Sequence, residues 1–127
     1  MRLTYADLSA AHGLKSLGGD AFRYCHGLRR VLLNEGLETI CPRCFEKCGV
    51  ERITFPRTLR RIEDGAFASY KGLKQVDLAD SALEDIGRSA FFESGLESFT
   101  APSSLGAIGE DAFYGCKSLK HVDLSGM

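Results

Sequence analysis

Three cysteines close together in the sequence are the residues whose types and spacing most directly suggest chemistry. Cys41 and Cys44 form a Cys-x-x-Cys pair, and Cys48 follows four residues later. Such a pair is redox-active when the start of a helix lowers a thiol pKa, and three cysteines supply three of the four ligands of a zinc site. A thiol or zinc site at Cys41, Cys44 and Cys48 is therefore one interpretation of this segment.

The other residue types that carry catalysis are not arranged for it. His12, His26 and His121 lie far apart, with no serine or cysteine partner at a recognisable spacing. The sequence has no glycine-rich phosphate loop, and no pair of acidic residues recurs as a catalytic dyad. The sequence therefore predicts a protein that is not an enzyme and that needs no cofactor.

Length and composition exclude several classes of protein. A chain of 127 residues makes one ordinary domain. The 16 basic and 17 acidic side chains nearly cancel, so nothing favours a nucleic acid as partner. No apolar run approaches the ~18 residues of a membrane span, and the first residues do not resemble a signal peptide. Five cysteines cannot all pair within the chain, which argues against a disulfide scaffold.

A repeat of 22 to 24 residues dominates the sequence. Each copy contains a phenylalanine, which we call the anchor, at Phe22, Phe45, Phe67, Phe91 and Phe113. Each anchor is preceded by a small residue, by an aliphatic residue five positions earlier, and by a leucine three positions before that. The residue three positions after the anchor is, in chain order, Cys25, Cys48, Tyr70, Ser94 and Cys116.

A second apolar block of the form L-x-x-V-x-L follows each anchor, as in Leu73-x-x-Val76-x-Leu78, and a weaker copy at Tyr5 and Leu8 opens the chain. Two copies lack one residue before this block, at Gly49 and Gly95, and residues 79–82 add one after it. We expect loops at these positions, where changes in length cost little.

The repeat predicts the fold. The V-x-L alternation has the period of a strand, and A-F-x-x-C has the spacing of one turn of an α- or 3₁₀-helix. Units this small bury their apolar side only by stacking. We predict one domain over residues 1–127, an α/β solenoid that is right-handed and curved. One long parallel sheet lies on its concave face, and short helices or 3₁₀ turns lie on its convex face. It has about five repeats and a degenerate N-terminal half-repeat.

The repeat also reinterprets the cysteines. Cys25, Cys48 and Cys116 occupy one column, and Cys44 takes the place of an alanine, so only Cys41 has no counterpart. This favours buried structural thiols over redox chemistry or metal binding. Repeated core thiols weakly favour an intracellular or organellar compartment over secretion.

These residues resemble the BspA-like leucine-rich repeat family over residues 5–124. The matching segments are Leu59-x-x-Ile62…Ala66-Phe67, Leu105-x-x-Ile108-Gly109…Ala112-Phe113-x-x-Cys116 and Leu119-x-x-Val122-x-Leu124. The resemblance implies a protein-binding module, of a kind found at cell surfaces of bacteria and parasitic protists and expanded in algal protists. The asparagine ladder of the more familiar leucine-rich repeat is reduced here to Asn34.

The leading functional interpretation is a non-enzymatic protein–protein interaction module, and two surfaces are candidates. The concave face is predicted to be basic at its N-terminal end and neutral to acidic later, so Arg30→Glu with Arg52→Glu is expected to weaken binding of a partner. On the convex face, Phe92 and Tyr114 are predicted to be neighbours that point outward. The alternative for either surface is a solvated face. The concave residues are Arg30, Leu32, Arg52, Thr54, Gln75, Asp77, His121 and Asp123.

A second interpretation is an accessory subunit held permanently in a larger assembly, for example a protist or algal one associated with a membrane. The last strand block ends at Leu124, close to the end of the sequence, so a partner or a second copy stacked end to end is expected to cover it, unless the chain is a fragment of a longer array. An isolated module is expected to be soluble, whereas a released subunit is expected to aggregate.

Overall fold

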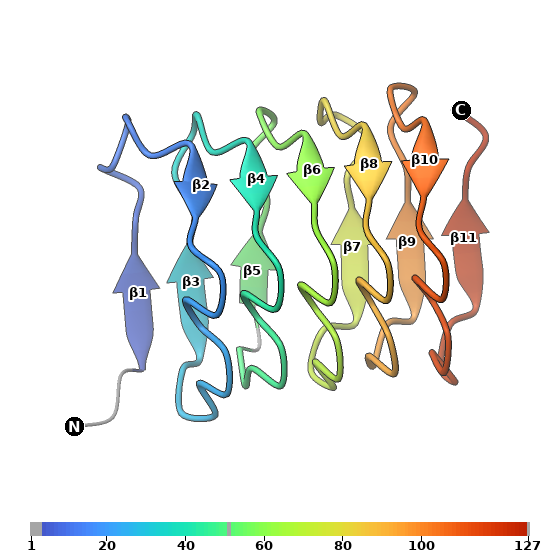
Figure 1. The fold of residues 1–127 in the computed structure, drawn as a ribbon, viewed down its shortest axis with the longest axis horizontal. Helices are drawn as coiled ribbons and strands as arrows, with labels where there is room; N and C mark the ends of the chain where they lie inside the picture. The colour runs from blue at the N-terminus through green and yellow to red at the C-terminus, as the bar shows by residue number, and fades with distance from the viewer. Residues whose placement is uncertain (1–3, 51, 127) are drawn as a thin grey trace.

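The chain winds into a solenoid in which three-residue and two-residue strands alternate along the sequence (Figure 1). The computed structural model describes residues 4–50 and 52–126, and of Arg52 it describes the backbone only. The two sets of strands lie on opposite sides of the solenoid, with the short strands in front in Figure 1. The solenoid and its parallel strands, which the repeat predicted, are therefore confirmed.

The V-x-L blocks form the longer strands. Their middle residues Val31, Val76 and Phe99 are buried while the flanking side chains face outward, because successive side chains of a strand point to opposite sides. The strands pair in parallel, with Val31 opposite Ile53, but in two three-stranded sheets and not in the single sheet predicted. The order in the first is β1-β3-β5 and in the second β7-β9-β11. Their bounds are β1 Tyr5–Asp7, β3 Arg30–Leu32, β5 Arg52–Thr54, β7 Gln75–Asp77, β9 Ser98–Thr100 and β11 His121–Asp123.

A further parallel sheet, which the sequence analysis did not predict, forms at the L-x-x-I blocks. Five two-residue strands pair in the order β2-β4-β6-β8-β10 and run the length of the solenoid. The second residue of each strand points inward and is buried at Leu17, Ile40, Ile62 and Ile86. The strands are β2 Ser16–Leu17, β4 Thr39–Ile40, β6 Arg61–Ile62, β8 Asp85–Ile86 and β10 Ala107–Ile108.

The predicted helices at A-F-x-x-C are not confirmed, because the described residues contain turns there and no helix. The residues two before and two after each anchor have positive φ, as at Ser89 (55°) and Glu93 (52°) around Phe91. A helix cannot pass through residues whose φ alternates in sign. Instead, the N–H of an anchor donates to the next coil, from Phe67 to the Ala90 carbonyl at 2.7 Å and from Phe91 to that of Ala112 at 2.8 Å.

The anchors themselves form a stack through the middle of the core. Neighbouring rings lie 5.2 to 5.4 Å apart between centroids and are nearly parallel. Phe45, Phe67 and Phe91 are completely buried, and Phe55 and Phe99 meet the stack edge-on. Both geometries are favourable for aromatic pairs. One ring in each coil therefore fixes the register of the coils.

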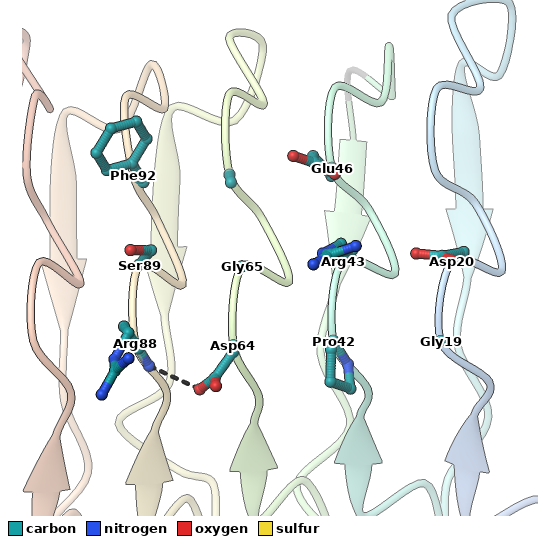
Figure 2. Close-up of a pocket in the computed structure, with 11 residues that line it drawn as sticks. Gly19, Asp20, Pro42, Arg43, Glu46, Asp64, Gly65, Arg88, Ser89 and Phe92 are labelled. Carbon is teal, nitrogen blue, oxygen red and sulfur yellow. Dashed lines mark hydrogen bonds between the residues drawn. The ribbon is translucent and has the colours of Figure 1, made fainter.

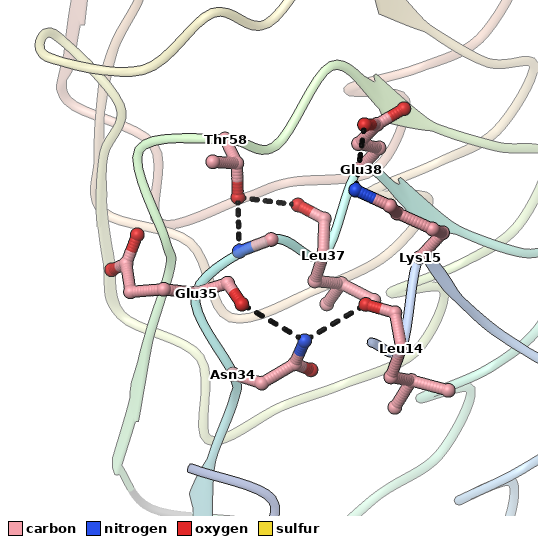
Figure 3. Close-up of polar contacts among 8 residues, drawn as sticks. Leu14, Lys15, Asn34, Glu35, Leu37, Glu38 and Thr58 are labelled. Atoms are coloured by element: carbon pink, nitrogen blue, oxygen red, sulfur yellow. Dashed lines mark hydrogen bonds and ion pairs between the residues drawn. The ribbon is translucent and has the colours of Figure 1, made fainter. Parts of the chain in front are cut away.

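Polar side chains join the coils where the long strands turn into the short ones (Figure 3). Asn34 is fully buried, and its Nδ2 donates to the carbonyls of Leu14 (2.8 Å) and Glu35 (3.2 Å). Thr58 Oγ1 donates to the Leu37 carbonyl at 2.8 Å and accepts the Gly36 N–H at 3.0 Å. In this one coil, Asn34 therefore makes the side-chain-to-backbone hydrogen bonds that a continuous asparagine ladder would repeat in every coil.

Tyr70 lies three residues after its anchor, at the position where the other repeats have cysteine or serine. It is fully buried, and among the described residues its hydroxyl has no hydrogen-bond partner. Burial raises the pKa of Tyr70 well above its usual value, with a smaller contribution from Cys48. Because a buried unpaired hydroxyl costs ~1–3 kcal/mol, Tyr70→Phe is expected to leave the free energy of unfolding unchanged or to raise it by about 1 kcal/mol. Urea denaturation measures this, and a loss of stability would show that the hydroxyl is bonded.

The last described coil exposes apolar side chains that earlier coils bury. Val122 is 45% exposed, whereas its equivalent Val76 is 1% exposed. Ile108 and Leu124 are also exposed. In the part of the chain that is described, no helix has the length and apolarity that crossing a bilayer would require.

Candidate functional site: a hollow on the turn face

The long-strand face, formed by the outward side chains of β1, β3, β5, β7, β9 and β11, carries most of the predicted concave residues. Arg30, Thr54, Gln75 and His121 are exposed, and Leu32 is half-buried. The predicted contribution of the Arg52 side chain lies outside the described residues. Arg30 lies with its guanidinium carbon 5.7 Å from the centre of the Tyr5 ring. The predicted side chains that are described lie on one surface, and of them Asp77 lines a small hollow of about 180 Å³ beside Phe55 and Arg57.

The acidic residues predicted on this face have a local structural role. The Asp123 carboxylate accepts hydrogen bonds from the Ser125 hydroxyl (2.6 Å) and the Ser125 N–H (2.9 Å), and these two bonds, in that order, lower the pKa of Asp123. The Asp77 carboxylate accepts the Ala79 N–H at 3.1 Å in the same way. These contacts close the turn after each long strand. Asp77 and Asp123 therefore help to end their strands, a role that the sequence analysis missed.

The turn face is the surface formed by the turns at residues 18–25, 41–48, 63–70, 87–94 and 109–116. Phe92 and Tyr114 lie on it as the sequence predicted, in adjacent coils, with ring centroids 5.4 Å apart and planes 12° apart. Tyr114 is 62% exposed, whereas Phe92 is half-buried. The pair is therefore outward as a whole, but only Tyr114 is largely in solvent.

A hollow of about 580 Å³ lies beside Phe92, and we call it the anchor hollow (Figure 2). Its size is that of an ordinary ligand pocket. It lies where the middle coil has smaller residues than its neighbours at two positions. Ala68 stands in the position of Glu46 and Phe92, and Gly65 in that of Arg43 and Ser89. The other lining residues are Gly19, Asp20, Pro42, Asp64 and Arg88.

The acidic groups of the anchor hollow are already paired within the molecule. Arg23 Nε donates to Glu46 Oε1 at 2.6 Å, and an Arg23 Nη lies 3.9 Å from Asp20 Oδ1. Asp64 Oδ1 accepts the backbone N–H of Arg88 at 2.9 Å, as Figure 2 shows.

The two arginines that line the anchor hollow form no ion pair among the described residues. Arg43 and Arg88 are exposed, and among the described residues their guanidinium groups have no acidic partner. With Arg23 counted, three arginines face the three acidic side chains Asp20, Glu46 and Asp64, so the charges around the hollow balance.

A second hollow of about 460 Å³ lies farther along the same turns, because its residues Lys47, Ser69 and Glu93 directly follow Glu46, Ala68 and Phe92. Lys71 lines it, and its Nζ donates to the Glu93 carbonyl oxygen at 2.5 Å. His26, Cys48, Gly49 and Gly72 complete the lining. We call it the lysine hollow. Of the residues that line the two hollows, Phe92 was predicted from the sequence to bind protein and Cys48 was an alternative thiol or zinc ligand.

The three cysteines that suggested chemistry lie in an environment that does not activate thiols. Cys44 and Cys48 are buried, and burial raises their pKa to about 12 and about 11. Burial also raises the pKa of the half-buried Cys41, with a smaller contribution from Glu63. A redox-active thiol needs the opposite shift. Within residues 4–50 and 52–126, no group of three or more His, Cys, Asp or Glu side chains is arranged to hold a metal ion.

The thiols therefore give a direct test. At pH 8 we expect iodoacetamide to leave Cys44 and Cys48 of the folded protein unmodified and to label both after unfolding, as read by peptide mass spectrometry. The pKa of the Cys44 thiol is near 9.0 in the unfolded chain and about 12 in the folded one. The difference in pKa therefore adds to the free energy of unfolding in full below pH 9, and this contribution is lost as the pH rises towards 12. Rapid labelling of native Cys44 would restore the thiol-site interpretation.

Comparison with known proteins places this geometry in a family. The profile of the BspA type Leucine rich repeat region matches residues 2–120 in six copies. A leucine-rich repeat protein from Bacteroides ovatus is 30% identical with a TM-score of 0.79, over 86% of this chain and 28% of that one. The T. pallidum Leucine Rich Repeat protein is 26% identical with a TM-score of 0.77, over 85% and 62% of the two chains.

A leucine-rich repeat protein from Eubacterium ventriosum shares the fold at 20% identity and a TM-score of 0.79, over 87% of this chain and 29% of that one. This chain therefore spans about a quarter to three-fifths of the lengths of these three proteins. No curated protein sequence matches it. The six matched copies, the stacked coils and the solved structures agree that the chain belongs to the BspA-type leucine-rich repeat family.

Proposed function

We propose that this chain is a non-enzymatic protein-interaction module that binds its partner on the turn face. The observation that carries the proposal is the anchor hollow, where the half-buried ring of Phe92 borders a space that the small residues Gly65 and Ala68 leave open. Aromatic walls of this kind are typical of the centres of protein interfaces. The membership in a leucine-rich repeat family is consistent with a binding role and adds no partner of its own.

The long-strand face is the rival surface for the same function. Apart from Tyr5, its exposed side chains are polar, and Asp77 and Asp123 are occupied in closing turns. The test predicted from the sequence is Arg30→Glu with Arg52→Glu, in which Arg30→Glu reverses an exposed charge on this face and leaves the turn face unchanged. If the partner binds the long-strand face, this pair of substitutions weakens binding. Because we place the partner on the turn face, we expect the affinity to change less than about twofold.

The experiment that tests the function selects ligands without assuming a site. A random dodecapeptide library displayed on phage is panned against the folded chain, and the selected peptides are measured by isothermal titration against folded and heat-unfolded protein. We expect ligands that bind only the folded chain, with a Kd of about 100 µM or lower. Failure to select any ligand that distinguishes folded from unfolded protein would overturn the proposed function.

A permanent place in a larger assembly is the second candidate. The observation that favours it is the exposure of the apolar side chains of Ile108, Val122 and Leu124, which another subunit of the assembly would cover. Native mass spectrometry of the purified chain distinguishes the two candidates. An interaction module is expected to be a soluble monomer, whereas an obligate subunit is expected to aggregate or to form multimers.

A further inference from the structure

We propose that the break between the two long-strand sheets receives an extended segment of a partner protein, which adds a strand between β5 and β7. This inference goes beyond the proposed function, because it concerns another face of the solenoid and another kind of contact. Three observations lead to it: the separation of the two strands, the unpaired backbone groups on their facing edges, and the exposure of the core beside β5.

The strands β5 and β7 lie farther apart than the other consecutive long strands (Figure 1). No Cα atom of β5 is within 8 Å of a Cα atom of β7, whereas paired strands are ~4.8 Å apart. A strand inserted between two others separates them by about twice that spacing, ~9.6 Å. The separation is therefore too large for direct pairing and leaves most or all of the width that an added strand requires. We call this opening the strand gap.

The two coils stay in contact on either side of the strand gap. Before the strands, a Cβ on Gly72 would lie 3.3 Å from the backbone oxygen of Val50. After them, the Ala82 N–H donates to the Arg57 carbonyl at 3.0 Å. The short strands of the same part of the solenoid pair without interruption, in the order β4-β6-β8. The strand gap is therefore a local opening, confined to the long strands and the residues next to them.

The two edges of the strand gap carry backbone groups without partners. Successive residues of a strand direct their N–H and C=O groups alternately to the two sides of the strand. The Lys74 carbonyl accepts the Ser98 N–H of β9 at 3.2 Å, so the groups of Gln75 and Asp77 face β5. By the same alternation, the N–H and C=O of Ile53 face β7. None of these groups has a backbone partner among the described residues, so both edges offer donors and acceptors to an added strand.

The core is less covered beside β5 than beside the other inner strands. Ile53 is half-buried, whereas its equivalents Val31, Val76 and Phe99 are each 1% exposed. Phe55, the next inward-facing residue of this coil, is also half-buried. Apolar side chains at alternate positions of an added strand would lie beside these two residues and cover them. We therefore expect the partner's segment to carry apolar residues two positions apart, as in Val-x-Leu.

A hollow of about 180 Å³ marks the end of the strand gap where the strands turn. Residues of both coils line it, so side chains do not close the opening there. They are Phe55, Arg57, Asp77, Leu78, Asp80 and Ser81. Charges of both signs are present in this lining, which therefore does not select the charge of the segment. Recognition rests on backbone hydrogen bonds and alternate apolar side chains, as in other cases where a peptide adds a strand to a sheet.

The first test concerns the free chain. The amides of Gln75 and Asp77 are expected to exchange with solvent at least about tenfold faster than those of Ser98 and Thr100, which pair with β7. Hydrogen exchange of ¹⁵N-labelled protein, read by NMR, measures each amide. Equal protection of the two pairs would show that the strand gap is closed, and the inference would be wrong. Protection of Gln75 that rises with protein concentration would identify a second copy of this chain as the occupant and overturn a partner's segment.

The second test uses matched peptides. The probe is Lys-Thr-Val-Thr-Leu-Lys, blocked at both ends; the controls are the same peptide with its central amides N-methylated and Lys-Thr-Thr-Val-Leu-Lys, in which the apolar residues no longer alternate. Each is titrated into ¹⁵N-labelled protein. We expect the probe to bind at least about tenfold more tightly than either control. The largest shifts are expected at Ile53, Gln75 and Asp77, and exchange of the last two amides is expected to slow.

One variant and its matched control test the edge from the side of the protein. Gln75→Pro removes an N–H that faces the strand gap and places a ring carbon there, and proline is tolerated where the ladder does not use the N–H. It is expected to weaken binding of the probe about tenfold or more. Gln75→Ala keeps the N–H and is expected to change the affinity less than about twofold. Spectra of the free variants show whether each is folded, and the N-methylated peptide gives the same test without changing the protein.

The outcomes separate this inference from the proposed function. If the control peptides bind as tightly as the probe, if the shifts lie on the turn face, or if no shift appears at millimolar peptide, the inference is wrong. In each of those cases the proposed function still stands when library-selected ligands protect the turn face. Selected ligands that leave the turn face unprotected overturn its assignment as the binding surface, and the strand gap is then judged by the matched peptides alone.

Discussion

Replacing Gly95 by alanine is expected to lower the free energy of unfolding by about 3 kcal/mol or more. A Cβ built on Gly95 would lie 1.9 Å from the backbone oxygen of Lys71 in the preceding coil, and one on Gly49 would lie 2.3 Å from that of His26. Neither glycine has a positive φ, so the cause is the close approach of two coils and not backbone strain. The backbone oxygen cannot rotate away as a side chain could, so the coils must separate.

The matched control for this substitution is Gly13→Ala, because a Cβ there meets no atom within 4 Å. Urea denaturation of the two variants and the parent measures the difference. We expect Gly13→Ala to leave stability within about 1 kcal/mol of the parent. Equal effects of the two substitutions would show that the coils are not in contact at the shortened loops.

Replacing Phe67 by alanine is expected to cost about 4 kcal/mol, the usual range for a fully buried phenylalanine. Phe67 stands in the middle of the anchor stack, 5.3 Å from Phe45 and 5.4 Å from Phe91, and it meets Phe55 edge-on at 5.7 Å. Its removal leaves a cavity between two rings whose positions are set by their own coils, so the space cannot close without shifting the coils.

The control is Phe22→Ala at the N-terminal end of the stack, where the ring is half-buried and has one stacked neighbour, Phe45. We expect about half the loss seen for Phe67, measured by the same denaturation. An equal loss at both positions would indicate that the stack is not the continuous core of the solenoid. A broadened transition for Phe67→Ala would indicate that the two halves unfold separately, as in other repeat proteins.

The buried columns were predictable from the sequence because the period repeats them. The anchors, the aliphatic residues before them and the V-x-L pairs recur often enough to reveal inward-facing positions, and Phe45, Ile62 and Val76 are buried as predicted. The short strands were missed because a strand of two residues shows no alternation. The turns were taken for helices because residues three apart are close in both, and the sign of φ is visible in the sequence only at glycines such as Gly65 and Gly115.

The shortened loops and the anchor hollow show why other features escaped prediction. Loops that lose one residue at Gly49 and Gly95 were expected to tolerate change, but shortening draws each loop against the preceding coil. The anchor hollow depends on a side chain that is small at Ala68. The sequence pattern drew attention to the aromatic residues Phe92 and Tyr114 in that column, and the empty space appears only when the coils are stacked.

The central claim is that a protein ligand binds the turn face, and amide hydrogen exchange of a complex with a library-selected ligand tests it most directly. The comparison is between free and bound chain, read by mass spectrometry over peptides that separate the turns from the long strands. Binding on the turn face is expected to slow exchange at residues 63–70 and 87–94, which include lining residues of both hollows. Protection confined to β3, β5, β7, β9 and β11, with the turns unchanged, would contradict it.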